Sequence, residues 1–338
     1  RRAGYDGIII ESQSTKPVYL WIHDDNVEIR DAGPIWGAEI GDAMAWFETD
    51  IGQQRYRTAL IGPSGEKMVL FANILADCSH AFGRCGLGAV MGSKNLKGVV
   101  VKGSQRPTAA DNEQILALNR IMKGRYKATP FVPYGTGAAV DAFEAVGNLP
   151  VRNYSGGSFP NVDKISAVTL MDQYGVAMEG CFNCPIRCKK KINLTDAPWP
   201  LENIYGGPEY ETLASFGSNL LIDDLPAICK ANEICNRFGI DTISAGATVA
   251  FAMECFENGL LTPEDVDGLE LNFGNAAAML TLLEQIAQRR GIGDVLARGS
   301  KKAAEIIGQD SINYAMQVKG LEIPYHEPRL NQGLSIHY

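Results

Sequence analysis

Three cysteines lie close enough in the sequence to bind a single metal centre. Cys181, Cys184 and Cys188 form a C-x2-C-x3-C pattern, and Pro185 disfavours a helix through this loop. Three thiolates from one loop can converge on a [4Fe–4S] cluster, which needs four ligands. Zinc also takes four ligands, but structural zinc sites usually combine two separated cysteine pairs, and the sequence has no second C-x2-C pair. The pattern therefore favours an iron–sulfur cluster; the alternatives are a zinc site and three unrelated buried thiols.

The remaining cysteines do not identify a fourth cluster ligand. Cys229, Cys235 and Cys255 fall at helical positions, where we expect them to pack as small apolar residues. A chain of 338 residues does not need disulfides for its stability, so the cysteine usage indicates a reducing, cytoplasmic setting. The basic run at 187–191 adjoins the cysteines and would either dock an acidic electron carrier or form a solvated loop.

A glycine-rich segment at 76–98 could hold a phosphorylated ligand. Gly83, Gly86, Gly88 and Gly92 would let the backbone approach a ligand closely, and the N–H groups of a turn can line an anion site. The match to a dinucleotide-binding fingerprint is only partial. The interval to the next strand is too short for a normal crossover helix, and no acidic residue follows that strand. We therefore expect a phosphorylated ligand other than NAD, with a purely structural tight turn as the alternative.

Length and composition describe an ordinary globular chain of more than one domain. Of 338 residues, 46% are apolar and 21% are charged, and the net charge of −8 argues against binding nucleic acid through its phosphates. No apolar stretch approaches the roughly 18–20 residues that span a bilayer. Four histidines exclude a site that needs many imidazole ligands. Because the chain has no initiator Met, we expect it to be an internal piece of a longer protein.

The elements that must position these residues change in character near residue 105. The first part predicts a β-hairpin, with strands at 18–22 and 27–29. A helix is expected at 35–49, and β-branched or aliphatic runs predict strands at 57–61, 68–75 and 99–101. This first part is therefore α+β.

Helical periodicity dominates the rest of the chain. Helices are expected at about 111–125, 138–145, 165–179, 224–238, 242–258, 276–290 and 294–307. Asp223 or Asp224 would cap the start of the helix at 224–238. The helices at 224–238, 242–258 and 276–290 would end at Gly239, Gly259 and Gly291, respectively. The helix at 242–258 is expected to bury one stripe of apolar residues.

Five further short sequence motifs occur along the chain, in the same order as in a known family. They are at 3–6, 90–97, 207–211, 235–244 and 324–329. Together with the glycine-rich segment and the cysteine cluster, they resemble the aldehyde:ferredoxin oxidoreductase family of tungsten enzymes. The resemblance implies part of an α+β first domain, followed by mostly α-helical domains. The implied boundaries are 1–105 for the pterin-binding domain, 106–308 for a helical iron–sulfur and pterin domain, and 309–338 for the start of a third.

The resemblance also implies the cofactors. In the family, a tungsten ion is held by the dithiolenes of two pterins beside one [4Fe–4S] cluster; molybdenum is the alternative metal. Cys181, Cys184 and Cys188 match three of the cluster ligands. The fourth ligand and the family's catalytic histidine are expected beyond Tyr338.

Two motifs of the family match positions that would bind the pterins. The first corresponds to His80, Ala81, Gly83 and Arg84, and the second to Asn236, Ile240 and Asp241. The backbone carbonyl of Ala81 would help hold Mg2+ that bridges the two pterin phosphates. An arginine is usual where His80 stands, and an aspartate is usual where Asn236 stands.

Glu211 matches a glutamate near the metal and is the candidate general base. The alternative is that Glu209 and Glu211 follow Pro208 in the first turn of a helix, where negative charge is favourable. Some members bind an iron through a Glu-x-x-His pair. Those positions read Lys230 and Glu233 here, so we predict no such iron.

The remaining candidates are less specific. The resemblance places Glu327 and Arg329 at the edge of a substrate channel, while His23 and His337 are expected to be ordinary surface or core histidines. The implied function is oxidation of an aldehyde to a carboxylate, with electrons passing to ferredoxin or a similar carrier. The alternatives are a tungsten subunit of a benzoyl-CoA type reductase and a non-catalytic, metal-stabilised helical module. A homodimer is compatible with the resemblance, whereas a nucleic-acid partner and a membrane span are not expected.

Overall fold

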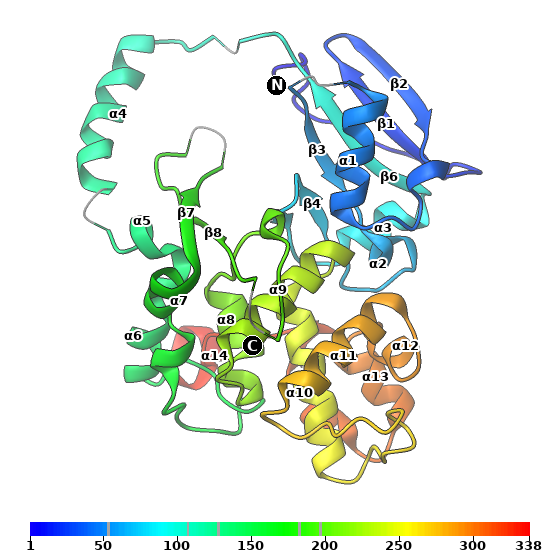
Figure 1. Ribbon diagram of the computed structural model, residues 1–338, viewed down its shortest axis with the longest axis vertical. Coiled ribbons are helices and arrows are strands. Elements are labelled where there is room, and N and C mark those ends of the chain that lie inside the picture. Colours follow the sequence, from blue (N-terminus) through cyan, green and yellow to red (C-terminus); the bar gives the residue numbers. More distant parts are fainter. Residues whose placement is uncertain (53–54, 107, 127–128, 182–183, 196–197) are drawn as a thin grey trace.

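The computed structural model describes residues 1–52, 55–106, 108–126, 129–181, 184–195 and 198–338. Its first part is built on a six-stranded sheet with the order β2-β1-β6-β3-β4-β5 (Figure 1). Strands β1 and β6 run parallel, and the other neighbouring pairs run antiparallel. The strands are β1 (Val18–His23), β2 (Asn26–Asp31), β3 (Arg57–Leu60), β4 (Ile74–Ala76), β5 (His80–Phe82) and β6 (Leu96–Lys102). The expected hairpin at the start of the sheet is confirmed.

Helix α1 (Ile40–Asp50) covers one face of this sheet. Ile40, Ala43 and Phe47 recur at helical spacing and are fully buried against Tyr19 of β1. The helix begins later than the expected residue 35. A short 3-10 turn at Gly33–Ile35 precedes it, and Pro34 lies in that turn.

The segment expected as a strand at 68–75 is a strand only in its last residues. Met68 adopts a positive φ of 61°, and its N–H bonds to the carbonyl of Gly65. The N–H of Ala72 bonds to the carbonyl of Val69. These turns satisfy the backbone locally, so regular pairing begins only at Ile74.

The glycine-rich segment forms β5, a turn and the short helix α3 (Leu87–Ser93). A Cβ on Gly86 would lie 2.2 Å from the carbonyl oxygen of Leu70, and one on Gly92 would lie 2.0 Å from that of Gly65. A Cβ on Gly88 would lie 2.3 Å from the carbonyl oxygen of Asn73. These three glycines are therefore required by backbone packing. A Cβ on Gly83 would approach nothing closer than the Ala81 Cβ, at 4.0 Å.

The rest of the chain is rich in helices, as expected. They are α2 (Pro63–Glu66), which still belongs to the first part, and α4 (Asn112–Tyr126), α5 (Phe131–Tyr134), α6 (Val140–Ala145), α7 (Ala167–Tyr174), α8 (Tyr210–Phe216), α9 (Leu225–Phe238), α10 (Thr242–Glu257), α11 (Ala276–Gln288), α12 (Gly293–Leu296), α13 (Ser300–Ile307) and α14 (Gln332–His337). Two small antiparallel ladders accompany them, β7 (Gly175–Glu179) with β8 (Lys189–Ile192) and β9 (Gln317–Val318) with β10 (Leu321–Glu322). Across the described residues, no helix combines the length and apolarity needed to cross a bilayer.

Helix α10 is the centre of the helical core. It is buried on nearly every side rather than along the single stripe that was expected. A Cβ on Gly246 would lie 1.9 Å from the Ser215 hydroxyl oxygen, so α8 and α10 cross in close contact. Cys229, Cys235 and Cys255 are buried in this core, which confirms their expected packing role.

Three helix ends differ from the expected ones. The helix expected at 165–179 stops at Tyr174, because the following residues pair with β8 instead. The last expected helix is divided into α12 and α13 around Gly299, whose φ is 83°. Asp224 caps α9, but Arg289 rather than Gly291 takes the left-handed position that ends α11.

The sheet and the helical part pack against each other through backbone contacts. The N–H of Asn73 bonds to the carbonyl of Gly239, and the N–H of Asp241 bonds to the carbonyl of Phe71. A Cβ on Gly62 would lie 2.2 Å from the carbonyl oxygen of Phe238. The residues just before the glycine-rich segment and the start of α10 are therefore neighbours. Figure 1 shows the sheet above the helical body, with α4 standing apart from both.

Candidate metallopterin and iron–sulfur site

The three clustered cysteines lie on the loop that joins β7 to β8. The ladder pairs Glu179 with Lys189, so the two ends of the loop are held together. The N–H of Cys184 bonds to the carbonyl of Cys181 at 3.0 Å. Residues 182 and 183 of the cluster motif lie outside the described residues.

The three thiols are free and differ in their surroundings. Cys181 and Cys184 are exposed, whereas Cys188 is half-buried. Burial raises the pKa of the Cys188 thiol, and the nearby charges of Glu209 and Cys181 raise it further. Thiolates are suitable donors for iron–sulfur clusters and zinc. Within the described ranges, however, no three His, Cys, Asp or Glu side chains are gathered closely enough to hold a metal ion.

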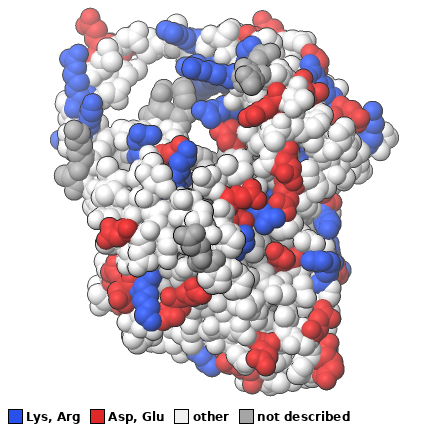
Figure 2. Space-filling view, in the orientation of Figure 1, with Lys and Arg blue, Asp and Glu red and all other residues white. Residues whose placement is uncertain are grey.

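The basic run beside the cysteines is largely paired with carboxylates. Lys190 is fully buried, and its Nζ lies 3.3 Å from Oε2 of Glu209. Lys189 approaches the other oxygen of Glu209 at 3.7 Å, and Lys191 pairs with Glu179 at 2.8 Å. The solvated-loop alternative therefore fails at Lys190, because the pairs of Lys189 and Lys190 attach the hairpin to Glu209, the residue before α8. Figure 2 shows acidic and basic side chains intermingled across much of this face.

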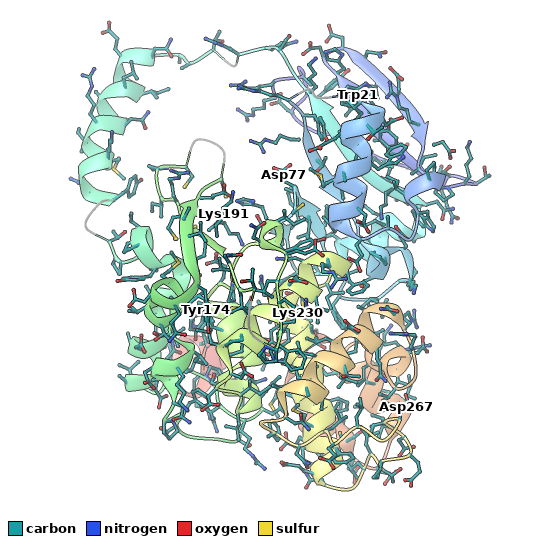
Figure 3. All side chains as sticks on the ribbon, viewed as in Figure 1. Trp21, Asp77, Tyr174, Lys191, Lys230 and Asp267 are labelled. Carbon is teal, nitrogen blue, oxygen red and sulfur yellow. The ribbon has the colours of Figure 1, made fainter. Side chains whose placement is uncertain are left out.

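His80 lies in β5 beside this hairpin. Its Nδ1 is 3.4 Å from the Ser79 hydroxyl oxygen, and its Nε2 is buried without a hydrogen-bond partner among the described residues. Burial lowers the pKa of His80, and the charge of Lys189 lowers it further. Figure 3 shows Asp77 on the side of the sheet that faces the hairpin with Lys191. His80 therefore lies close enough to Lys189, at the end of the cysteine loop, for the lysine charge to act on it.

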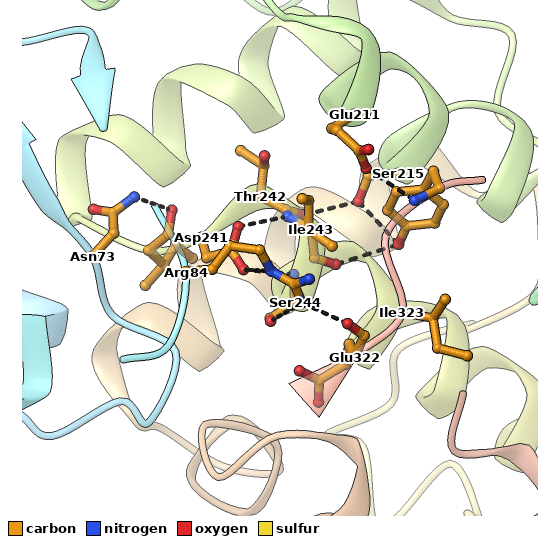
Figure 4. Close-up of polar contacts among 12 residues, drawn as sticks. Asn73, Arg84, Glu211, Ser215, Asp241, Thr242, Ile243, Ser244, Glu322 and Ile323 are labelled. Atoms are coloured by element: carbon orange, nitrogen blue, oxygen red, sulfur yellow. Dashed lines mark hydrogen bonds and ion pairs between the residues drawn. The ribbon is translucent and has the colours of Figure 1, made fainter. Parts of the chain in front are cut away.

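Arg84 and Asp241 come from the two predicted pterin motifs and form an ion pair. Arg84 Nε lies 3.2 Å from Asp241 Oδ2, and Arg84 Nη2 donates to the backbone carbonyl of Glu322. Asp241 also caps α10 by accepting from the N–H groups of Ile243 and Ser244 at 3.1 and 3.2 Å. Burial raises the pKa of Asp241, and the Arg84 charge opposes that rise. Figure 4 shows Arg84 between Asp241 and Glu322.

The other predicted pterin-binding residues differ in burial: Ala81 is exposed, whereas Asn236 and Ile240 are buried. Ala81 is exposed in β5 and pairs with Leu75 across the ladder. Asn236 donates its side-chain N–H to the carbonyl of Tyr205 at 2.9 Å. Ile240 is fully buried, and its carbonyl accepts from the Asn73 side chain at 3.0 Å. Asn236 and Ile240 therefore already make internal contacts.

Glu211 lies in the first turn of α8, and its carboxylate is partly exposed. Its Oε2 accepts from the backbone N–H of Tyr325 at 2.9 Å. Its Oε1 lies 3.4 Å from Nε2 of His326. His326 lies in the family-like motif at 324–329, but the sequence did not identify it as a functional residue. No local pattern predicts its contact with Glu211, because the two residues are far apart in the sequence.

Tyr325 connects Glu211 to the start of α10. Its side chain is fully buried, and its hydroxyl lies 3.2 Å from the Ser215 hydroxyl and 3.3 Å from the carbonyl of Ile243. Because Ile243 follows the Asp241 cap, the carboxylate of Glu211 and the Arg84–Asp241 pair belong to one connected network (Figure 4).

The remaining candidates pair with close neighbours. Lys230 and Glu233 form an ion pair of 2.7 Å. Glu327 and Arg329 also pair, at 2.6 Å, and they line a cavity of about 280 Å3. Glu211 is not among the described residues that line this cavity.

Comparisons with known proteins follow the same division of the chain. A family model described as the N-terminal domain of aldehyde ferredoxin oxidoreductase matches residues 1–103, and one described as domains 2 and 3 matches residues 116–338. A tungsten-containing aldehyde ferredoxin oxidoreductase of Thermococcus kodakarensis is 39% identical over 99% of this chain. The WOR-like subunit of an aliphatic sulfonate oxidoreductase of Pyrococcus furiosus is 36% identical over 96%.

A solved structure is also similar. It is the active-site complex BamBC of benzoyl coenzyme A reductase with 1,5-dienoyl-CoA, with a TM-score of 0.79, 28% identity, and coverage of 96% of this chain and 51% of that one. The two curated relatives are each covered over 55% of their length, so this chain spans about half of them. The chain belongs to the aldehyde ferredoxin oxidoreductase family.

Membership of this family implies a tungstopterin cofactor, and the surrounding residues fit one. The buried Nε2 of His80 has a hydrogen-bonding capacity that no described residue meets. The open space beside Gly83 would allow the backbone to approach a ligand, and the Arg84 guanidinium supplies positive charge nearby.

Proposed function

We propose that the protein containing this chain oxidises an aldehyde to a carboxylate at a tungsten–pterin centre. An aldehyde and a water molecule give the acid, two protons and two electrons. We propose that the electrons leave through a [4Fe–4S] cluster to ferredoxin or a similar carrier. The observation that carries the proposal is the partly exposed carboxylate of Glu211, which shares one hydrogen-bonded network with Arg84 and Asp241.

His80, Gly83 and Arg84 would hold the phosphate and polar groups of a pterin, opposite Asp241. Ala81 would contribute its backbone carbonyl to Mg2+, and Asn236 and Ile240 would line the second pterin position. When bound, the tungsten–pterin centre supplies the two-electron redox chemistry. The chain's own task is to orient the cofactor and to place charge around it.

Glu211 would accept the proton of the water or hydrated aldehyde. Its carboxylate is held by the Tyr325 N–H on one oxygen, which leaves other lone pairs for a proton. Glu209, two residues earlier, instead forms an ion pair with the buried Lys190 and so attaches the β7–β8 hairpin. This difference supports Glu211 rather than Glu209 as the base.

Cys181, Cys184 and Cys188 would bind three irons of the cluster, with the fourth ligand supplied from outside this chain. A cytoplasmic setting is supported by eight free cysteines, since iron–sulfur chemistry requires reduced thiols. The carrier and a homodimeric arrangement are proposed on the family resemblance alone.

The test is an anaerobic preparation of the full-length protein, analysed for metals and assayed with aldehydes and a viologen dye. We expect tungsten or molybdenum, cluster iron and aldehyde-dependent dye reduction. Glu211→Gln should lower kcat by about 100-fold or more, as expected for loss of a general base. Absence of tungsten, molybdenum and cluster iron would reject the proposal.

A second candidate is a tungsten subunit that reduces an aromatic ring bound to coenzyme A. It is favoured by the similarity to the BamBC complex over 96% of the chain. The same preparation assayed with a dienoyl-CoA and with an aliphatic sulfonate would separate these substrates from aldehydes. A colourless protein with one zinc per chain would instead indicate a non-catalytic module.

A further inference from the structure

The imidazole of His326 is held in a single orientation by four neighbours. The ring of Phe143 meets it edge-on at 5.4 Å, and the ring of Tyr210 lies 5.2 Å away at 31°. Its two nitrogens face Asn148 and Glu211. The side chain nevertheless remains 36% exposed, so the ring forms part of an accessible surface beside Glu211.

Asn148 determines which imidazole nitrogen carries the hydrogen in the neutral ring. The Asn148 Oδ1 accepts from the backbone N–H of Glu327 at 3.1 Å, so its amide N–H group must face the other way. That group lies 3.3 Å from Nδ1 of His326, which therefore accepts. In the neutral ring the hydrogen then lies on Nε2, and Nε2 is 3.4 Å from Oε1 of Glu211.

The backbone that carries His326 is anchored by a left-handed turn. Arg152, Asn153 and Tyr154 have consecutive positive φ values of 48°, 47° and 64°, an unfavourable conformation for residues other than glycine. The N–H groups of Arg152 and Asn153 bond to the carbonyls of Ser218 and Asn219 at 3.1 Å, directly after α8. The Tyr154 hydroxyl donates to the carbonyl of Pro324 at 3.0 Å.

The turn therefore ties the segment before His326 to the helix that carries Glu211. The ring of Tyr154 also stacks on Tyr325 at 6.2 Å and 17°. Strain of this kind persists only where surrounding contacts over-determine it. Here those contacts fix the distance between α8 and the segment 323–326.

We propose that His326 is a positioning residue for Glu211, and the inference rests on the proposed function. The Tyr325 N–H donates to Oε2, and Nε2 of His326 lies 3.4 Å from Oε1, so each oxygen of the carboxylate has a polar neighbour that limits its rotation. The remaining lone pairs are then directed to the open side, where a proton from water would be accepted. No part of this arrangement requires His326 itself to touch the substrate.

The first experiment compares two substitutions in the full-length holoenzyme. His326→Leu removes the donor and should lower kcat by about 100-fold with little change in KM, because the carboxylate is misplaced. His326→Gln keeps an N–H donor at a similar reach and should restore activity to within about ten-fold of the wild type. The matched control is His23→Leu, since His23 also lies beside a carboxylate, 3.9 Å from Asp24, but far from the site.

A second experiment does not depend on activity. Diethyl pyrocarbonate acylates unprotonated imidazole nitrogens, and peptide mass spectrometry would give the rate at His326 relative to His23. Glu211→Gln leaves a single amide oxygen, which the Tyr325 N–H occupies, so the atom beside Nε2 of His326 is no longer a carboxylate oxygen. The rate at His326 should rise in this variant while the rate at His23 stays constant.

The outcomes separate the two proposals. Suppose that the wild type is active. If the Leu and Gln variants then have equally low activity, or both keep the wild-type activity, the role proposed for His326 is wrong and the proposed function still stands. A wild type with metals but no aldehyde activity would reject the proposed function, while the acylation rate still decides whether His326 holds Glu211. If the Leu variant does not fold, the proposal is tested by the activity of the Gln variant and by the acylation rate at His326.

Discussion

Arg84 Nε and Asp241 Oδ2 lie 3.2 Å apart, although the two residues are separated by 157 positions in the sequence. The first follows β5 at the edge of the sheet, and the second caps the central helix α10. This ion pair therefore joins the glycine-rich segment to the helical core at the point where the predicted pterin motifs meet.

The energy of this ion pair can be measured by a double-mutant cycle. Arg84→Leu removes the charge, and Asp241→Asn removes the partner but keeps an N-cap. We expect a coupling free energy of about 1 kcal/mol, reduced by the partial exposure of Arg84. Urea unfolding of the two single variants and the double variant would give it. The exposed pair Arg298 and Asp294 should give almost no coupling, and equal values for both cycles would contradict the prediction.

Two glycines of the same segment should respond differently to alanine. Gly92→Ala would place a Cβ 2.0 Å from a backbone oxygen and should lower the free energy of unfolding by about 1–3 kcal/mol. Gly83→Ala meets open space and should change stability by less than about 0.5 kcal/mol. Thermal denaturation checks both values. A Gly83→Ala protein that is stable but poor in bound pterin would support a cofactor contact at this position.

The clustered cysteines should change their reactivity when metal is removed. In the anaerobic protein we expect Cys181, Cys184 and Cys188 to resist iodoacetamide, and after chelation all three should react. Cys188 should then be the slowest of the three, because burial raises its thiol pKa and lowers the thiolate fraction. Alkylation mapped by mass spectrometry gives these rates.

Other cysteines of the chain provide the controls for this measurement. Cys85 is exposed and should react both before and after chelation. Cys229 and Cys235 are buried and should react only when the protein unfolds. Equal reactivity of the clustered cysteines with and without metal would show that they bind none.

The Glu327–Arg329 pair predicts a pH-dependent contribution to stability. Burial acts to raise the pKa of Glu327, but hydrogen bonds from the Arg329 side chain and backbone outweigh it and lower the pKa. A lowered folded-state pKa adds stability above the unfolded value of about 4.3, and this stability is lost as pH falls through the folded value.

The variant Glu327→Gln should therefore be less stable than the wild type at pH 7, by about 0.5 kcal/mol because Arg329 is largely exposed. The difference should vanish in acid, and unfolding measured between pH 3 and 7 tests this. Arg329→Met removes the same pair and should show the same trend. A difference that grows as pH falls would contradict the assignment.

Local patterns predicted a large part of the fold correctly. The hairpin of β1 and β2 and the long helices α9, α10 and α11 follow from alternation, helical periodicity and capping residues, which act over a few positions. One error came where pairing with another strand decided the outcome. Gly175–Glu179 continues a helical pattern but forms a strand, because β8 is available for pairing.

Motifs and their spacing were enough to predict the family, the thiol-rich loop and the residue types that could bind a cofactor. The packing of distant elements was needed to show which glycines contact other backbone, that Lys190 is buried, and that Glu211 faces His326. Glu211 and His326 are more than one hundred positions apart in the sequence. Their distance depends on how helix α8, the left-handed turn at 152–154 and the segment 323–326 pack together, and no local pattern records that.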